Sequence, residues 1–278
     1  MFKEELKKIV IEEQRKGTPN FLIKNILKEY LQFPVLNFIY NNKKYKSLIF
    51  TGGSCLRVCF DLPRMSEDLD FDLKKSDWKK FNIEELARDI QKYFKRDFLF
   101  DVEIKIQGDR RIYLKFPILK ELGITNNSES DLLYVKIEPT ETGFITPEVE
   151  VQSVFRYGYN FIIRRYSLSF LMTGKLNAIF LREWFSGKNN EVNIKGRDFY
   201  DLYWYLEKKI EPNYKNLKKS IDIENKNKLY QELKKRIEKN ITSQKLSHDL
   251  KNFFKEQNFV DDFCKNYKQI IFAKLDEG

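Results

Sequence analysis

The segment Thr51–Leu73 constrains the fold more than any other part of this chain, because a glycine turn and an alternating acidic strand follow each other within it. A short apolar run predicts a strand that ends at Gly52 and Gly53, and Ser54 then begins a predicted helix. Over residues 65–73 the pattern alternates, so a strand there places Asp on one face and Leu or Phe on the other. A strand, a tight turn, a helix and an acid-faced strand are therefore predicted in immediate succession.

This segment joins two binding features that are each weak alone. Gly52 and Gly53 allow close approach of the backbone, and the free N–H groups of the next helix, with the Ser54 hydroxyl, suit a phosphate. Asp68 and Asp70 lie two apart on one strand face, so their oxygens can chelate a hard cation such as Mg²⁺. An isolated Gly-Gly-Ser is typical of a structural turn, and an isolated Asp-x-Asp of a solvated strand. The two together indicate nucleotide chemistry.

The rest of the first half predicts both helices and strands. Apolar periodicity predicts helices over 2–16, 21–40 and 81–95. Pro34 is expected to interrupt the second helix, and Ser76 or Asp77 to cap the third. Three more strands are predicted over 98–106, 111–116 and 132–138. We therefore expect a mixed sheet with helices beside it.

The second half predicts helices alone. Strand patterns vanish beyond about residue 165, and helices are predicted over 167–185, 197–210, 226–240 and 246–273. The chain is accordingly expected to be of the α+β class, with a sheet-containing domain at 1–160 and an all-helical domain at 161–278.

Charge and composition limit the chemistry. Lys and Arg number 51 against 41 Asp and Glu, so the formal charge of +10 favours polyanionic partners. The Lys-rich run 208–239 fits either an RNA-backbone contact or a solvated helix face. One histidine, His248, and three cysteines predict neither a zinc cluster nor a disulfide framework, so carboxylates must hold any metal. With no membrane-length apolar stretch and no signal-type N-terminal pattern, we expect a cytoplasmic protein without membrane contact.

Two sequence stretches resemble a known family. Gly52-Gly-Ser-x-Leu-Arg57, followed by Leu62-Pro-Arg-Met-Ser-Glu-Asp-Leu-Asp-Phe-Asp-Leu73, is similar to the first motif of the AbiEii/AbiGii-type, MenT-like nucleotidyltransferases. These are the toxin halves of abortive-infection (phage-defence) and toxin–antitoxin systems. The resemblance covers most of residues 20–210. It implies a mixed-sheet nucleotidyltransferase core of the polymerase-beta type, followed by an all-helical C-terminal domain.

The same resemblance extends to a later strand. Leu132-Leu-Tyr-Val-Lys-Ile-Glu138 is similar to the strand that supplies the third carboxylate of the core, although many relatives carry Asp at the position of Glu138. The resemblance thus implies Glu138 as the third metal ligand. The alternatives are a polar residue on a half-buried strand at this position, or a ligand role for Asp101 or Glu103.

Two helical stretches complete the resemblance. Lys175 with Arg182, and Arg197-Asp198-x-x-Asp201, are similar to the family's basic helix and Arg-Asp signature. The resemblance implies that Lys175 contacts nucleotide phosphate, the alternative being a surface lysine, and that Asp198 orients Lys175 or the acceptor hydroxyl. The spacing of seven puts Lys175 and Arg182 on one helix face, and the spacing of three does the same for Asp198 and Asp201. Arg182 and Arg197 fit either a phosphate contact or a structural ion pair, and Asp201 fits a helix–helix hydrogen bond.

Five further residues have weaker assignments. Ser66 and Arg64 precede the acidic strand and fit either a nucleotide contact or a role in shaping the turn. Cys55 and Cys59 are predicted to be small core residues, and no catalytic role is assigned to the single histidine.

The expected activity follows from these assignments. The resemblance implies an enzyme that transfers NMP from an NTP to the 3′ end of tRNA and so blocks translation, with a cognate antitoxin as partner. Asp68, Asp70 and Glu138 would hold Mg²⁺, or Mn²⁺, and Lys175 and Asp198 would complete the catalytic set, while Gly52, Gly53, Ser54, Ser66, Lys175 and Arg182 would bind the nucleotide. The alternatives are a nucleotidyltransferase that acts on a protein or small molecule, and a non-catalytic nucleotide-binding module.

Overall fold

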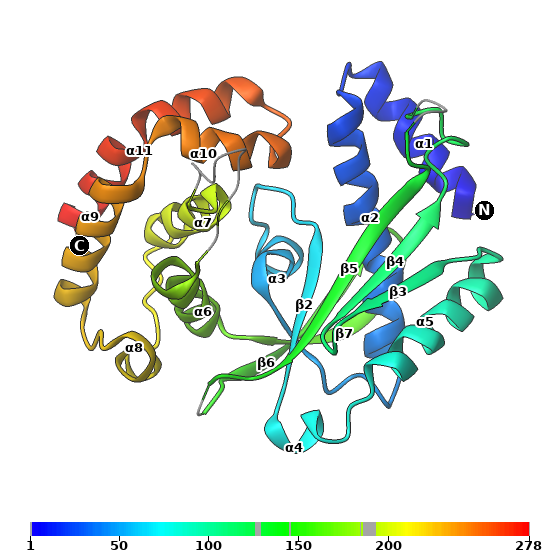
Figure 1. Cartoon of the computed structure of the whole chain (residues 1–278), viewed down its shortest axis with the longest axis horizontal. Helices are drawn as coiled ribbons and strands as arrows, with labels where there is room; N and C mark the ends of the chain where they lie inside the picture. The colour runs from blue at the N-terminus through cyan, green and yellow to red at the C-terminus, as the bar shows by residue number, and fades with distance from the viewer. Residues whose placement is uncertain (1, 126–128, 145, 184, 186–192, 278) are drawn as a thin grey trace. The chain divides into compact units, whose positions relative to one another are not determined.

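The computed structural model describes residues 2–125, 129–144, 146–183, 185 and 193–277 (Figure 1). The chain divides into two compact units. The first comprises Met1–Gly143 with Val149–Arg165, and the second Phe144–Glu148 with Tyr166–Gly278. None of the described helices combines the length and apolar character that crossing a membrane requires.

The first unit is built on a mixed sheet. The described strands are β1 (Ile49–Thr51), β2 (Asp68–Leu73), β3 (Glu103–Gln107), β4 (Arg111–Pro117), β5 (Leu132–Glu141), β6 (Val149–Arg156) and β7 (Tyr159–Tyr166). Their order is β3-β4-β5-β2-β1-β7-β6. β2 pairs in parallel with β5, and β1 with β7, whereas β1–β2, β3–β4 and β4–β5 are antiparallel. The predicted α+β class with a mixed sheet is confirmed.

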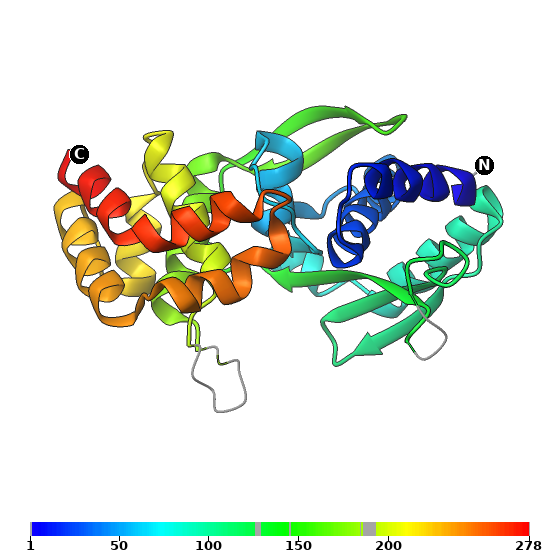
Figure 2. The same ribbon diagram turned by 90° about the horizontal axis from the view of Figure 1, so that it is seen from above.

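Helices cover the apolar face of this sheet. The helices of the first unit are α1 (Phe2–Arg15), α2 (Asn20–Asn41), α3 (Gly52–Phe60), α4 (Lys75–Trp78) and α5 (Ile83–Phe98). Figure 2 shows α1, α2 and α5 along the same side of β3, β4 and β5. Ring contacts there join Phe2 on α1, Phe94 on α5 and Phe116 on β4, with Phe2–Phe94 and Phe94–Phe116 centroids 6.0 and 5.2 Å apart. The apolar side chains of the sheet pack against these helices, so the polar side chains of β2, β4 and β5 lie on the opposite face.

Two helix predictions in this unit were wrong. Pro34 does not interrupt the second helix, since α2 continues through it. A proline removes one backbone hydrogen bond, but its neighbours Phe33 and Val35 are fully buried, and that apolar burial outweighs the loss. Ser76 and Asp77 do not cap α5 either, because they lie within α4. Asn82 caps it instead, and its side chain accepts a 2.9 Å hydrogen bond from the Glu85 amide.

The hairpin of β6 and β7 lies outside the strands predicted from the sequence. Its outward positions carry exposed apolar side chains, among them Val151, Phe155 and Ile162. Val154, Phe161 and Ile163 point the other way and are buried. Apolar residues therefore occur on both faces, and the alternation that indicates a half-buried strand is lost.

The second unit is helical in its described part, apart from the end of β7. Its helices are α6 (Leu168–Leu181), α7 (Gly196–Glu207), α8 (Tyr214–Ile221), α9 (Lys226–Asn240), α10 (Ser243–Leu250) and α11 (Gln257–Glu277), with a short 3₁₀ turn, η1, at Lys251–Phe253. Gly196 permits close packing of α7 on α10, because a Cβ there would lie 2.6 Å from the Leu246 carbonyl oxygen. A helical C-terminal region, predicted from the sequence, is confirmed.

The predicted single helix over 246–273 is divided in the structure. The chain is extended at Phe254 between η1 and α11. This break buries both Phe253 and Phe254, and the Phe254 ring packs edge-on against Tyr200 with centroids 4.8 Å apart. The apolar burial of these two rings accompanies the break between η1 and α11.

Candidate active site

The glycine turn holds the acidic strand close to α3. α3 begins at Gly52, two residues earlier than predicted, directly after β1. Gly52 has a φ of +74°, and a Cβ there would collide with Oδ2 of Asp70. Glycine therefore serves twice at this position: it adopts the left-handed backbone, and it leaves space for the Asp70 carboxylate.

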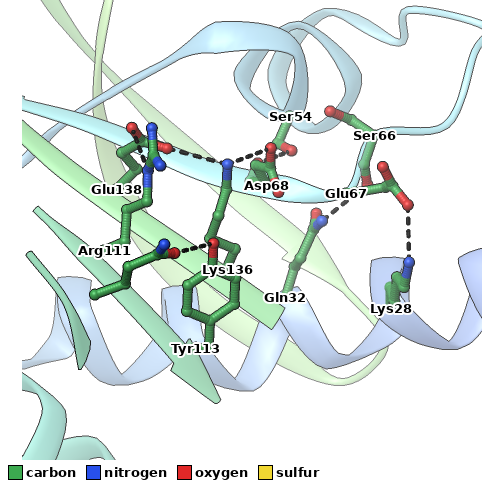
Figure 3. Close-up of polar contacts among 11 residues, drawn as sticks. Lys28, Gln32, Ser54, Ser66, Glu67, Asp68, Arg111, Tyr113, Lys136 and Glu138 are labelled. Atoms are coloured by element: carbon green, nitrogen blue, oxygen red, sulfur yellow. Dashed lines mark hydrogen bonds and ion pairs between the residues drawn. The ribbon is translucent and has the colours of Figure 1, made fainter. Parts of the chain in front are cut away.

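The second glycine of the turn lies against a buried arginine. A Cβ on Gly53 would be 2.6 Å from an Nη atom of Arg64 and 3.0 Å from Oγ of Ser66. Arg64 is buried, and its guanidinium donates a 2.9 Å hydrogen bond to the Met65 carbonyl. Buried Ser66 is held through its own carbonyl, which accepts a 2.9 Å hydrogen bond from Gln32 (Figure 3). The Arg64 guanidinium thus lies directly beside the turn.

Ser54 connects the start of α3 to the acidic strand. Its side chain is fully buried, and its hydroxyl donates to the main-chain carbonyl of Asp68. The Thr51 side chain at the N-cap makes no capping hydrogen bond. The hydroxyl of Ser54 therefore fixes the distance between the helix N-terminus and the first aspartate.

The sheet register assembles a charged face around the aspartates. In β2 the residues alternate between half-buried Asp and buried Leu or Phe, as predicted. The parallel pairing with β5 sets Asp68 opposite Lys136 and Asp70 opposite Glu138. Paired residues of neighbouring strands point to the same face of a sheet. Asp68, Asp70, Lys136 and Glu138 therefore share one face.

Ion pairs join most of this face (Figure 3). The Lys136 ammonium lies 2.9 Å from Oδ2 of Asp68 and 3.0 Å from Oε2 of Glu138. On the far side of Glu138, Nε of Arg111 donates a 3.1 Å hydrogen bond to Oε1. Lys136 and Arg111 were not singled out in the sequence. The one sequence signal was that Lys136 and Glu138 alternate with apolar residues in the predicted strand. This pattern does not say which strand lies beside it, so it could not place Lys136 next to Asp68.

The pKa values on this face reflect these pairs. Burial opposes the charge of Lys136, but the charges and hydrogen bonds of Asp68 and Glu138 outweigh burial and raise the pKa of Lys136. Burial likewise favours neutral Glu138, yet Lys136 and Arg111 hold its pKa below the usual range. Both side chains are therefore charged at neutral pH.

The donor set of this face suits a divalent cation in part. Asp68 and Asp70 supply the oxygen ligands that Mg²⁺ prefers. In the part of the chain that the structure describes, however, no three His, Cys, Asp or Glu side chains converge on one point. Glu138 is engaged by Lys136 and Arg111. The alternatives to Glu138 lie elsewhere: Asp101 pairs with Lys95 at 2.6 Å, and Glu103 lies on the exposed strand β3.

The second unit holds a buried charge cluster of its own. The Lys175 ammonium on α6 lies 2.7 Å from Oδ1 of Asp198 and 2.8 Å from Oδ2 of Asp201, both on α7. Arg182, just beyond α6, reaches the other carboxylate oxygen of Asp198 at 2.7 Å. Burial favours neutral Asp198, but Lys175 and Arg182 hold its pKa below the usual range. The predicted shared face of Asp198 with Asp201 is confirmed. The shared helix face predicted for Lys175 and Arg182 is wrong, because α6 ends at Leu181 and Arg182 has an extended backbone, although both side chains reach Asp198.

Arg197 makes a structural ion pair, one of its two predicted alternatives. Its Nε lies 3.3 Å from Oδ2 of Asp249, and its amide donates a 2.9 Å hydrogen bond to the same atom. The guanidinium also stacks on Phe253, 4.0 Å from the ring centroid. These contacts hold the start of α7 to α10.

The predicted site residues thus fall into two groups. Gly52, Gly53, Ser54, Ser66, Asp68, Asp70 and Glu138 come together in the first unit, and Lys175, Arg182 and Asp198 come together in the second. Cys55 and Cys59 are buried in α3, in agreement with a core role.

Known proteins give this arrangement a class. The family model described as the nucleotidyl transferase AbiEii toxin, type IV toxin–antitoxin system, matches residues 37–267. With the mixed sheet, the glycine turn and the Asp-x-Asp strand, this match defines the chain as a nucleotidyltransferase. More particularly, the chain belongs to the AbiEii family of nucleotidyltransferase toxins.

The solved structure of a nucleotidyltransferase toxin shares the fold. The MenT4 nucleotidyltransferase toxin of Mycobacterium tuberculosis aligns with 100% of this chain and 90% of its own, with a TM-score of 0.55 at 13% identity. JHP933 from Helicobacter pylori aligns with 91% of this chain and 94% of its own, with a TM-score of 0.47 at 18% identity. None of the curated proteins compared with the chain matches it.

Proposed function

We propose that this chain is a divalent-metal-dependent toxin that transfers NMP from an NTP to the 3′ end of tRNA and thereby stops translation in the cytoplasm. One observation carries the proposal: the Gly52 turn and the α3 N-terminus lie directly against Asp70, so a phosphate bound at that N-terminus would adjoin the carboxylate face. A cognate antitoxin is the partner that the family implies.

The proposed reaction displaces pyrophosphate. The 3′-hydroxyl oxygen of the acceptor forms a bond to the α-phosphorus, the bond from that phosphorus to the bridging oxygen of the β-phosphate breaks, and the hydroxyl proton passes to solvent. Asp68 and Asp70 would hold a divalent cation, whose charge neutralises the phosphate oxygens when it is bound. The N–H groups at the start of α3, with the buried Arg64 behind the turn, orient and neutralise a phosphate.

Lys175 is a phosphate-binding residue in this proposal. Asp198 and Asp201 hold its ammonium at fixed positions, which lowers the cost of ordering a long side chain when phosphate binds. Arg182, paired with Asp198, adds a second positive charge. We expect Lys175→Met to lose transfer while Arg197→Lys, at a structural ion pair, retains it.

The test is a transfer screen of each labelled NTP with total RNA or with a protein extract. The wild type should label tRNA, and Asp68→Asn and Asp70→Asn should not. Asp72→Asn is the matched control, because Asp72 lies on the same face of β2 and accepts a 2.8 Å hydrogen bond from Thr140. Label found only in protein would overturn the tRNA assignment. Full activity of Asp70→Asn, or Mg²⁺-dependent NTP binding without transfer to any acceptor, would overturn the catalytic proposal.

A further inference from the structure

Lys136 is placed where a cation would bind the acidic face. Its ammonium bridges Asp68 and Glu138 at 2.9 and 3.0 Å, and its side chain is 22% exposed (Figure 3). The parallel register sets Lys136 directly opposite Asp68, and Lys136 and Glu138 lie two apart on β5 and so share its face. The Lys136 ammonium cannot leave this position without losing two charged partners.

The neighbouring cation supports the same reading. Arg111 and Lys136 contact different oxygens of Glu138: Arg111 contacts Oε1, and Lys136 contacts Oε2. Both oxygens of Glu138 are thus engaged by protein cations. To bind a metal ion, Glu138 would have to share an oxygen with a protein cation or give that cation up, whereas Asp68 is bridged through one oxygen, Oδ2.

The local charge disfavours a metal ion at Glu138. Lys136 and Arg111 bring two positive charges to the two oxygens of this one carboxylate. A divalent ion at the same carboxylate would lie close to both of these cations, which is unfavourable in a partly buried site.

We propose that Lys136 is the resident cation of this face. It takes the place beside Asp68 and Glu138 that a second divalent ion would need, so the face binds one divalent ion, at Asp68 and Asp70. Glu138 is then a positioning residue that holds Lys136, and not a metal ligand. The inference rests on the proposed function only in taking this face as the one that binds metal.

The test counts Mn²⁺ ions bound to the full chain without nucleotide, from the free Mn²⁺ signal in electron paramagnetic resonance. The wild type and Glu138→Gln should each bind one ion. Lys136→Met should bind a second ion, or bind the first at least about tenfold more tightly, because a positive charge close to the ligands is lost. Lys136→Gln, which keeps a polar group, should behave in the same way if Lys136→Met does not fold.

Lys115→Met is the matched control. Lys115 lies on the same face, on β4 opposite Tyr134, whereas Tyr113 is the β4 residue opposite Lys136. Lys115→Met removes the same charge two positions along β4 from Tyr113, the residue opposite Lys136. Mn²⁺ binding by this variant should stay close to that of the wild type.

Three results would overturn the inference. The first is that the wild type binds two Mn²⁺ ions and Glu138→Gln binds only one. The second is that the Lys136 and Lys115 variants bind Mn²⁺ equally. The third is that neither the wild type nor the Lys136 variants bind Mn²⁺. NMP transfer is measured separately. Metal counts as expected with no transfer would refute the proposed function alone, and transfer with two ions would refute the role of Lys136 alone.

Discussion

Replacement of Gly52 by alanine tests whether the turn holds Asp70 in place. Gly52 has a φ of +74°, and an added Cβ would collide with Oδ2 of Asp70 and lie 3.0 Å from its Cβ and Cγ. Gly17 also has a φ of +74°, but nothing lies within 4 Å of its added Cβ. Both glycines belong to the first unit. The difference between Gly52→Ala and Gly17→Ala therefore isolates the cost of moving Asp70.

The magnitudes follow from these two geometries. A left-handed backbone costs an L-residue about 1–2 kcal/mol, which both variants share. The collision at Gly52 adds about 1–3 kcal/mol, the usual cost of an extra carbon in packed space. Each 1 kcal/mol lowers the melting temperature of a domain of this size by about 2–4 °C, so Gly52→Ala should melt several degrees below Gly17→Ala.

Activity gives the second measurement. Displacement of a reacting group by 1 Å can cost about 100-fold in rate, so Gly52→Ala should lose about that factor in NMP transfer. Gly17→Ala should keep the wild-type rate. Thermal melts followed by circular dichroism, and transfer of labelled NMP at saturating NTP, measure the two effects. Equal melting temperatures for the two variants, or full transfer by Gly52→Ala, would refute the reasoning.

Three further predictions concern stability. Asp198→Asn should destabilise the second unit by about 1.5–3 kcal/mol in urea unfolding, because Lys175 and Arg182 each lose a charged partner while Asp201 still pairs with Lys175. The pKa of Asp198 lies below its ordinary value of 3.8 in the folded protein. Its contribution to stability is therefore complete above pH 3.8 and is lost as the pH falls through the folded pKa. The difference in unfolding free energy between the wild type and Asp198→Asn should accordingly shrink in acid. Gly196→Ala should lower the melting temperature through a cost of about 1–3 kcal/mol, since its Cβ would meet the Leu246 carbonyl at 2.6 Å; an unchanged melting temperature would contradict this packing. Phe71→Ala, at a fully buried ring, should cost about 3–5 kcal/mol in the first unit, and a loss below 1 kcal/mol would show that β2 is not a core strand.

The sequence was most informative where structure depends on near neighbours. The alternation around Asp68 and Asp70 predicted an acid-faced strand, and β2 has that pattern. The spacing of Asp198 and Asp201 predicted a shared face, and both carboxylates reach Lys175. Such predictions succeed because the periods of strands and helices come from backbone geometry that acts over a few residues.

Long-range packing was the source of the errors. Pro34 is a strong local signal for a helix break, yet burial on both sides carries α2 through it. The β6–β7 hairpin has no local alternation because its outward face is also apolar, as Phe155 shows. In these cases the free energy of burial against distant residues exceeds the local preference.

The short-range patterns of the chain were enough to define its class, its two candidate ligands Asp68 and Asp70, and its family resemblance. These patterns did not say which residue of the adjacent strand lies opposite each aspartate. The register of β2 on β5 set Lys136 opposite Asp68 and Glu138 opposite Asp70, across 68 positions of sequence. Register depends on which faces of two distant strands are buried together, because a shift by one residue would turn every side chain to the other face. For that reason the ionic bridge of Lys136, on which the proposed role of Glu138 rests, could be seen only in the assembled sheet.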